Sequence, residues 1–165
     1  MQFCILLGAS FAAIATASLP PINIGYYAMP QRVNHIVAWS PFTPTTTQEL
    51  GDVCWEQGPV SGTPTWSIIR AASTYAYAPI CRNPFSITDI DTNTTYQDLE
   101  LACVDDNINW NAWPEVTAVV DRATNKAVET CVPVPPLEDG SSWQAFCGSP
   151  PFQSMLRYEW ACKSV

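Results

Sequence analysis

The sequence Glu115-Val-Thr-Ala-Val-Val-Asp-Arg-Ala-Thr-Asn-Lys-Ala-Val-Glu-Thr-Cys-Val-Pro-Val134 decides the fold. Two runs rich in β-branched residues flank a short polar turn, which is the pattern of a β-hairpin. Asn125 is expected to adopt the left-handed conformation, because Asn tolerates positive φ better than any residue except Gly. With a bulge at Asn125, the predicted register pairs Val120 with Val128, Ala118 with Thr130 and Val116 with Val132. This register makes one face of the hairpin mostly apolar and places Thr117 beside Cys131 on the other.

Further strands are predicted on both sides of this hairpin. Short alternating or β-branched runs indicate strands at 34–39, 65–70, 85–88, 96–104, 143–147 and 155–162, separated by loops rich in Pro and Gly. In the run 96–104, Leu99 and Leu101 are expected to face the core, and Asp98 and Glu100 to face water. Helical turns are expected only within 47–53 and 67–78. The pattern predicts a mainly β protein, an antiparallel β-sandwich or β-barrel.

The chain divides into three parts. Residues 1–17 are expected to be a signal peptide, with an apolar run from Phe3 to Ile14 and the small-x-small cleavage site Ala15-Thr16-Ala17. Residues 18–48 contain no cysteine and are expected to form an extended N-terminal arm laid on the domain, with a disordered tail as the alternative. Residues 49–165 are expected to form the disulfide-stabilised β domain. No other apolar run is long enough to span a bilayer, so the mature chain is expected to be soluble.

The cysteines indicate an oxidising compartment. Cys4 lies in the predicted signal peptide, and the other six are Cys54, Cys81, Cys103, Cys131, Cys147 and Cys162. An even number of cysteines in a secreted chain predicts that all are paired, here in three disulfides whose connectivity the sequence leaves open. Zinc is disfavoured, because the chain has no CxxC pair and only one histidine, His35. We therefore expect no metal and no other cofactor.

The charge excludes two classes of partner. The net charge is −8, and the seven basic residues are scattered along the chain, whereas binding to phosphates needs clustered Lys and Arg. We expect neither a nucleic acid nor an anionic membrane surface as the partner. An extracellular protein or a polysaccharide is expected instead.

One loop has the composition of a sugar-binding surface. Asp105, Asp106 and Asn107 precede Trp110 and Trp113. Aromatic faces can stack on sugar rings, while carboxylates and amides bind the hydroxyl groups. The alternative is that both tryptophans cover the core from a loop.

A second polar loop contains the only glycosylation sequon, Asn93-Thr94-Thr95, and we expect a glycan on Asn93. Asp89, Asp91, Asn93 and Glu100 also follow the spacing of a calcium-binding loop. Thr94 stands where that loop normally needs Gly, and the flanks look like strands. A solvated acidic loop is therefore the favoured interpretation.

Catalysis is poorly supported by the residue inventory. Serine or cysteine hydrolases need a histidine beside the nucleophile, and His35 is the only one. Glycoside hydrolysis needs only two carboxylates and stays open. We assign no catalytic residue. The segment Val132–Pro136 could present a rigid recognition loop, as in a protease inhibitor, or could be a crossover between strands.

The overall layout resembles a broad class. A signal peptide opening Met1-Gln2-Phe3, six mature cysteines and an acidic, aromatic, strand-rich domain resemble fungal small secreted cysteine-rich proteins. Within that class, the run 143–147 followed by the alternating run 155–162 is similar to the Alt a 1-like β-barrel family, although the cysteine spacing departs from it. The resemblance implies an extracellular, effector-like role without enzymatic activity, and it implies no functional residue.

The expected function is therefore that of a secreted, non-enzymatic β-protein that binds a host or cell-wall component. Two alternatives remain open. One is a carbohydrate-binding module or small carbohydrate-active enzyme that uses the loop from Asp105 to Trp113. The other is a protease inhibitor.

Overall fold

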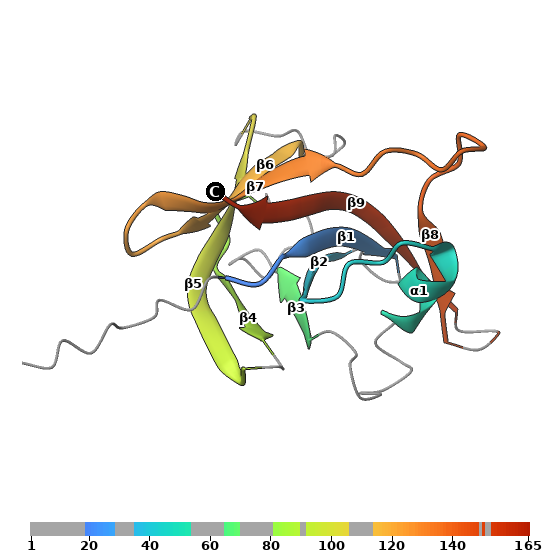
Figure 1. Ribbon diagram of the computed structural model, residues 1–165, viewed down its shortest axis with the longest axis horizontal. Helices are drawn as coiled ribbons and strands as arrows, with labels where there is room; N and C mark the ends of the chain where they lie inside the picture. Colours follow the sequence, from blue (N-terminus) through green and yellow to red (C-terminus); the bar gives the residue numbers. More distant parts are fainter. Residues whose placement is uncertain are drawn as a thin grey trace, which may run out of the picture.

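A computed structural model describes residues 19–28, 35–53, 65–69, 81–89, 92–105, 114–148, 150 and 153–165. This part of the chain is mainly β (Figure 1). The strands are β1 Asn23–Ala28, β2 His35–Ser40, β3 Thr65–Ile69, β4 Phe85–Asp89, β5 Thr94–Cys103, β6 Val116–Asp121, β7 Lys126–Pro133, β8 Gln144–Cys147 and β9 Ser154–Ser164, and the helix is α1 Thr47–Asp52. The strand class predicted from the sequence is confirmed.

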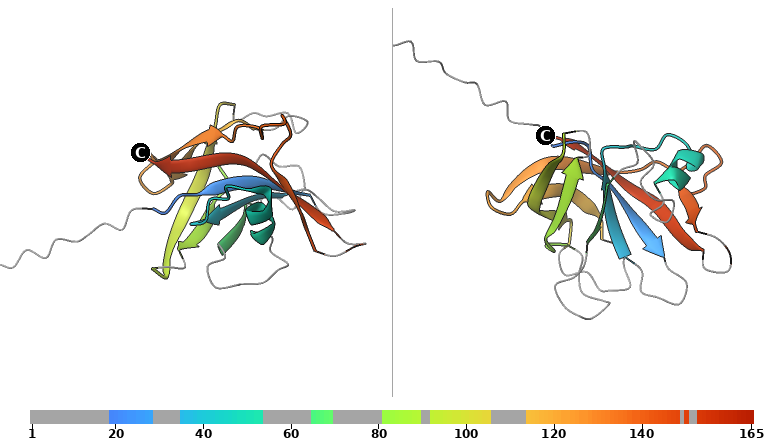
Figure 2. Two further views of the ribbon diagram at one scale, coloured as in Figure 1. Left: turned by 45° about the vertical axis from the view of Figure 1, so that its right-hand side comes forward. Right: turned by 90° about the horizontal axis from the view of Figure 1, so that it is seen from below.

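The strands form a single antiparallel sheet in the order β3-β2-β1-β9-β7-β6-β5-β4, with β8 attached to β9. The two end strands of this order, β3 and β4, lie next to each other, so the sheet curls into a nearly closed barrel (Figure 2). Of the two predicted architectures, the barrel describes this arrangement. Strand β9 lies between β1 and β7 and joins the N-terminal strands to the hairpin.

The hairpin forms, but only part of its predicted register is correct. Asn125 has a φ of 52°, and Ala118 pairs with Thr130, as predicted. The pairing of Val120 with Val128 is wrong, because Val120 pairs with Ala127 and the register shifts between Val119 and Val120. The bulge therefore lies at Val128, after the first two paired residues of β7.

The face of β7 that points into the core is the opposite of the predicted one. Glu129 is 0% exposed and Cys131 is buried, whereas Val132 is 54% exposed and Thr130 also faces solvent. The mostly apolar face predicted for the hairpin is thus wrong for β7. The pairing of Ala118 with Thr130 is as predicted, but the other face of the hairpin points into the barrel, because Cys131 must point inward to reach Cys162.

The segment predicted as an arm contributes β1 and β2 to the sheet. A strand at 34–39 was expected, and β2 matches it, but β1 was not predicted. Asn23 and Gly25 interrupt the β-branched pattern of β1, although both are buried. Gly25 is required by close packing, because a Cβ there would lie 2.8 Å from a ring carbon of Trp39.

The buried side chains form two clusters. One fills the barrel and includes Ile24, Leu101 and Trp160. The other lies on the opposite face of β1, β2 and β9, where Trp39 and Leu156 pack under α1 and β8. Strand β2 is buried on both faces, since its residues alternate between the two clusters. The barrel therefore has a second small core on its outside.

Helix α1 covers this second core, and its start is defined by local capping. The hydroxyl of Thr46 accepts a hydrogen bond from the backbone of Glu49, and the Glu49 carboxylate accepts from the backbone of Thr45 at 2.6 Å. Leu50 is the buried residue of the helix. The helical turn predicted within 47–53 is confirmed. Among the described helices, none is long and apolar enough to cross a membrane.

Two disulfides are present, Cys81–Cys103 and Cys131–Cys162. The second joins directly opposed residues of β7 and β9 inside the barrel. Cys147 is fully buried in the second core and is not free. Cys54, the remaining cysteine of the predicted six, lies outside the described residues.

Candidate functional site

The structure describes only one residue of the predicted sugar-binding loop. Asp105 is exposed, two residues after the end of β5. Asp106, Asn107, Trp110 and Trp113 lie outside the described residues. That loop stays a prediction.

Asn93 lies in the turn between β4 and β5, is exposed, and has a φ of 53°. Thr95 of the sequon is also exposed, and its hydroxyl lies 3.0 Å from that of Thr88. The asparagine side chain is therefore accessible to a glycosyltransferase. Asp89, by contrast, is buried and accepts a hydrogen bond from Thr92 at 2.8 Å. No group of metal ligands occurs among the described residues.

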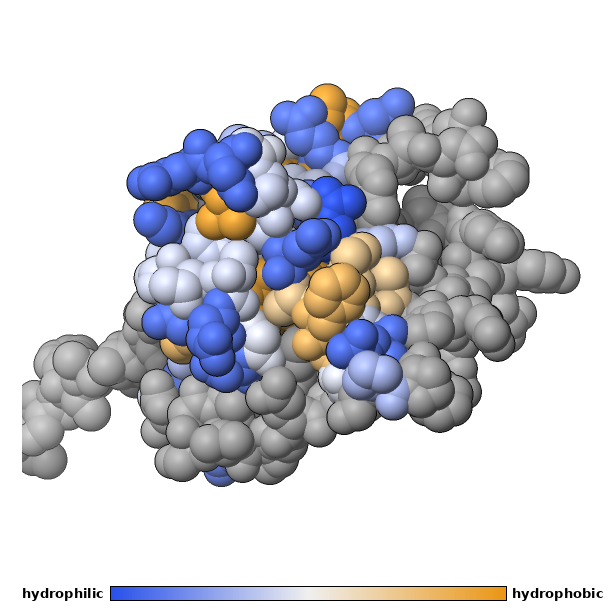
Figure 3. Space-filling model, turned by 90° about the vertical axis from the view of Figure 1, so that its right-hand side faces the viewer, coloured by the Kyte–Doolittle hydropathy of each residue, from blue (hydrophilic) through white to orange (hydrophobic). Residues whose placement is uncertain are grey.

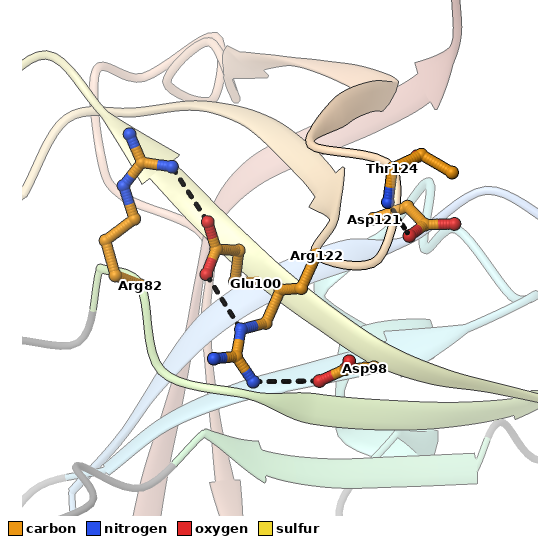
Figure 4. A network of polar contacts seen from close by, with 6 residues as sticks. All are labelled: Arg82, Asp98, Glu100, Asp121, Arg122 and Thr124. Atoms are coloured by element: carbon orange, nitrogen blue, oxygen red, sulfur yellow. Dashed lines mark hydrogen bonds and ion pairs between the residues drawn. The ribbon is translucent and has the colours of Figure 1, made fainter.

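Glu100 was expected to face water but is only 7% exposed. Its carboxylate lies between two arginines, with Oε1 2.8 Å from Arg82 Nη1 and Oε2 3.2 Å from Arg122 Nε (Figure 4). Arg122 also donates to Asp98 at 2.8 Å. The prediction that this face of β5 is solvated is thus wrong at Glu100, because the side chains of Arg82 and Arg122 cover it. The two arginines and the two acidic residues neutralise one another, and their ion pairs link Arg82 and Arg122 to the outer face of β5.

A buried polar cluster joins the start of β1 to the turn after β2. The hydroxyl of Tyr158 donates to Asn23 at 2.5 Å, and the amide of Asn23 donates to the backbone oxygen of Phe42 at 3.0 Å. Trp39 Nε1 donates to the same oxygen at 3.0 Å. Burial raises the pKa of Tyr158 to about 12, so this hydroxyl stays protonated and acts as a donor. The cluster is structural, since its polar groups are used in fixing the turn.

The segment proposed as a recognition loop lies along the sheet. Val132 and Pro133 belong to β7 and pair with β9, and the backbone N–H of Val134 donates to Glu159 at 2.9 Å. The backbone oxygen of Pro135 accepts a hydrogen bond from Trp143 Nε1 at 3.0 Å. These contacts hold the segment against its neighbours.

The most suggestive surface lies across β8, β9 and β1, and we call it the β8–β9–β1 face. Its members are directly opposed residues of the three strands, which share one side of a sheet. They form an apolar row of Phe146, Met155 and Ala28 and a polar row of Gln144, Arg157 and Tyr26. Phe146 is 62% exposed, and Met155 and Ala28 are half-buried. Seen from the side of α1 and β8, apolar atoms reach the surface between hydrophilic side chains (Figure 3).

Arg157 is the charged centre of this face. Its Nη2 lies 3.0 Å from Glu159 Oε1, while its buried Nε has no hydrogen-bond partner. Burial raises the pKa of Glu159, and the positive charge of Arg157 partly offsets this rise. Burial also raises the pKa of Tyr26, with Arg157 again acting in the opposite direction. A partly buried guanidinium beside a tyrosine offers planar, directed hydrogen-bond donors.

Strand β8 also has an open edge. Among the described strands it pairs only with β9. The backbone N–H of Tyr158 donates to the backbone oxygen of Trp143, so these two residues form a hydrogen-bonded pair. Hydrogen-bonded and non-hydrogen-bonded pairs alternate along an antiparallel ladder. Ala145 and Cys147 therefore direct their backbone groups toward β9, and Gln144 and Phe146 direct theirs outward. The sequence predicted a strand here, but it gave no signal for which edge or face would be exposed.

Comparison of the chain with protein-family models, with curated proteins and with solved structures finds no match. The resemblance to fungal secreted cysteine-rich proteins and to the Alt a 1-like family stays a prediction. The class that the fold and the surface define is a disulfide-linked, nearly closed β-barrel with an exposed aromatic face.

Proposed function

We propose that the protein is exported and works by binding another extracellular protein through the β8–β9–β1 face, without catalysing a reaction. The partner would lay an extended segment along the open edge of β8 and cover Phe146. The observation that carries this proposal is the exposed Phe146 in line with Met155, next to a row containing Arg157 and Tyr26. Aromatic residues, Met and Arg are the residue types enriched at protein interfaces.

Backbone geometry supports a strand-like ligand. An edge strand offers N–H and C=O groups that an added strand can pair with, and the neighbouring side chains then provide specificity. On β8 these groups belong to Gln144 and Phe146, and the Phe146 ring stands beside them. Binding of a polysaccharide by the loop from Asp105 to Trp113 is the competing outcome.

Replacing Phe146 by Asp should weaken binding to secreted host or cell-wall proteins at least tenfold, because a central aromatic anchor commonly contributes more than about 2 kcal/mol. The folded stability should change by less than about 0.5 kcal/mol, since the side chain is exposed. Binding would be measured by surface plasmon resonance against fractionated extracellular proteins and against cell-wall polysaccharides.

The matched control is Val132→Asp, which places the same charge on an exposed apolar position of β7. Equal loss of binding in both variants would contradict the proposal. Binding to polysaccharide that survives Phe146→Asp but is lost in a Trp110→Ala, Trp113→Ala double variant would instead support the sugar-binding alternative. Hydrolysis of a polysaccharide by the purified protein would overturn the non-enzymatic assignment.

Export is supported by the cysteines. Disulfides form and persist in oxidising compartments, and two are present. We extend this to a third pair, Cys54–Cys147, which are the two cysteines left over after the observed pairs. Val53, the C-cap of α1 and the residue before Cys54, shares the second core with Cys147.

Peptide mapping of secreted protein under non-reducing conditions is expected to find Cys54 joined to Cys147, no free thiol, a mature start near Ser18 and a glycan on Asn93. The disulfide is expected because the other four mature cysteines are already paired, and the glycan because Asn93 and Thr95 are exposed. A free thiol on Cys54 would rule out the third disulfide, and an unmodified Asn93 would rule out the glycan.

A further inference from the structure

The carboxyl group of Glu129 lies inside the barrel and plays no part in the proposed binding function. Glu129 of β7 is 0% exposed. Its Oε2 accepts a hydrogen bond of 3.2 Å from the backbone N–H of Ile22, and its Oε1 has no partner. A fully buried carboxyl with one oxygen unsatisfied is costly, so its position calls for an explanation.

The hydrogen bond from Ile22 ties Glu129 to the segment that leads into β1. This Leu19–Ile22 segment is also held by β9, since the backbone N–H of Cys162 donates to the oxygen of Ile22 at 2.8 Å, and Ser164 Oγ donates to that of Leu19 at 3.4 Å. Ile22 is fully buried, and Leu19 packs against the barrel core. The segment therefore covers the barrel interior where Glu129 lies.

The groups that face Glu129 carry no charge to balance it. Directly opposed to it are Val119 of β6 and Ser164 of β9, and Ile22 approaches from the N-terminal segment. The charged residues of the packed strands lie at other positions and are exposed or half-buried. They are Lys126 of β7, Asp121 of β6, and Arg157, Glu159 and Lys163 of β9. Lys163 is opposed to Thr130, which has its side chain on the other face of the sheet.

We propose that Glu129 is a pH-dependent latch for the Leu19–Ile22 segment. With its carboxyl protonated, Glu129 holds the segment closed over the end of the barrel. When the proton is lost, the buried carboxylate gains solvation only if the segment lifts and admits water. The latch therefore favours the closed form in acidic surroundings and the open form in alkaline ones.

The direction follows from the two protonation equilibria. In the closed form, burial raises the pKa of Glu129 from 4.5 to about 8. In the open form, the carboxyl is solvated and returns to its ordinary pKa. Closure is therefore fully favoured below pH 4.5, weakens about tenfold for each pH unit above that, and levels off above about pH 8.

Amide hydrogen exchange of the full-length secreted protein tests the latch. The protection factor of the Ile22 N–H, corrected for the intrinsic rate at each pH, should fall about a hundredfold between pH 5 and about pH 7.5. The N–H of Val104, which donates to Glu115 at 3.0 Å in another part of the sheet, serves as the internal reference and should not follow this fall. Constant protection of Ile22 relative to Val104 would overturn the proposal.

Two variants separate the latch from a general effect of pH. Glu129→Gln keeps an acceptor for the Ile22 N–H but cannot ionise, so protection of Ile22 should become independent of pH. Glu138→Gln makes the same chemical change at an exposed loop position and should behave like the unmodified protein. A pH-dependent fall that persists in Glu129→Gln would overturn the latch. If that variant does not fold, carbon-13 NMR titration of the Glu129 carboxyl in the unmodified protein decides instead, because a pKa near 4.5 would exclude the latch.

Discussion

Replacing Gly25 by alanine is expected to lower the free energy of unfolding by about 3 kcal/mol or more. The added Cβ would overlap the backbone oxygen of Arg157 and lie 2.8 Å from the ring of Trp39. Neither neighbour can move freely, because Arg157 belongs to β9 and Trp39 is fully buried. Gly25 also lies at the register shift between β1 and β9, so displacing it would disturb the central strand pair.

Urea denaturation followed by tryptophan fluorescence measures this effect. Gly51→Ala is the matched control, since a Cβ at Gly51 in α1 would meet nothing within 4 Å. That variant should be neutral or more stable by about 0.5–1 kcal/mol, because alanine favours a helix more than glycine does. If Gly25→Ala were as stable as the unmodified protein, the close packing of β1 against β9 and Trp39 would be wrong.

Removing the disulfide of Cys131 and Cys162 with a double alanine variant is expected to cost about 3–4 kcal/mol. The bond closes a loop with a sequence separation of 31 residues, so losing it raises the conformational entropy of the unfolded chain. Both sulfur atoms also belong to the buried cluster of the barrel, so their removal leaves unfilled space. The same denaturation experiment would record the loss.

Val132→Ala tests whether the effect is specific to the disulfide, because Val132 neighbours Cys131 on β7 but is exposed. That control should change the free energy of unfolding by less than about 0.5 kcal/mol. A loss below about 1 kcal/mol in the double cysteine variant would mean that the strand pairing of β7 with β9 is sufficient without the covalent link.

Periodicity alone predicted most strands, and its failures have a common cause. The runs that became β2, β3, β4, β8 and β9 were recognisable because each alternates or is rich in β-branched residues. Strand β1 was missed because Asn23 and Gly25 are buried for specific contacts, a hydrogen-bonded amide and a close backbone approach. Such contacts depend on partners far away in the chain, and no local pattern reports them.

The errors at Glu100 and Glu129 have different reasons. Sequence alternation placed Glu100 in water, but Arg82 and Arg122 fold over it. Glu129 is an inward residue because it shares a face of β7 with Cys131, which points inward to bond Cys162. The candidate face was beyond prediction as well, since the exposure of Phe146 depends on β8 lying at an edge of the sheet. The two observed disulfides agree with the prediction that the cysteines pair, although the sequence left the connectivity open.

The position of β9 sets the order in which the barrel can be completed. This strand follows the other described strands along the chain, yet it lies between β1 and β7 and also pairs with β8. Neither core is complete without β9, so both cores depend on pairings between distant parts of the chain. Such dependence on distant pairings slows folding, because the entropy of closing long loops is lost before the pairings form.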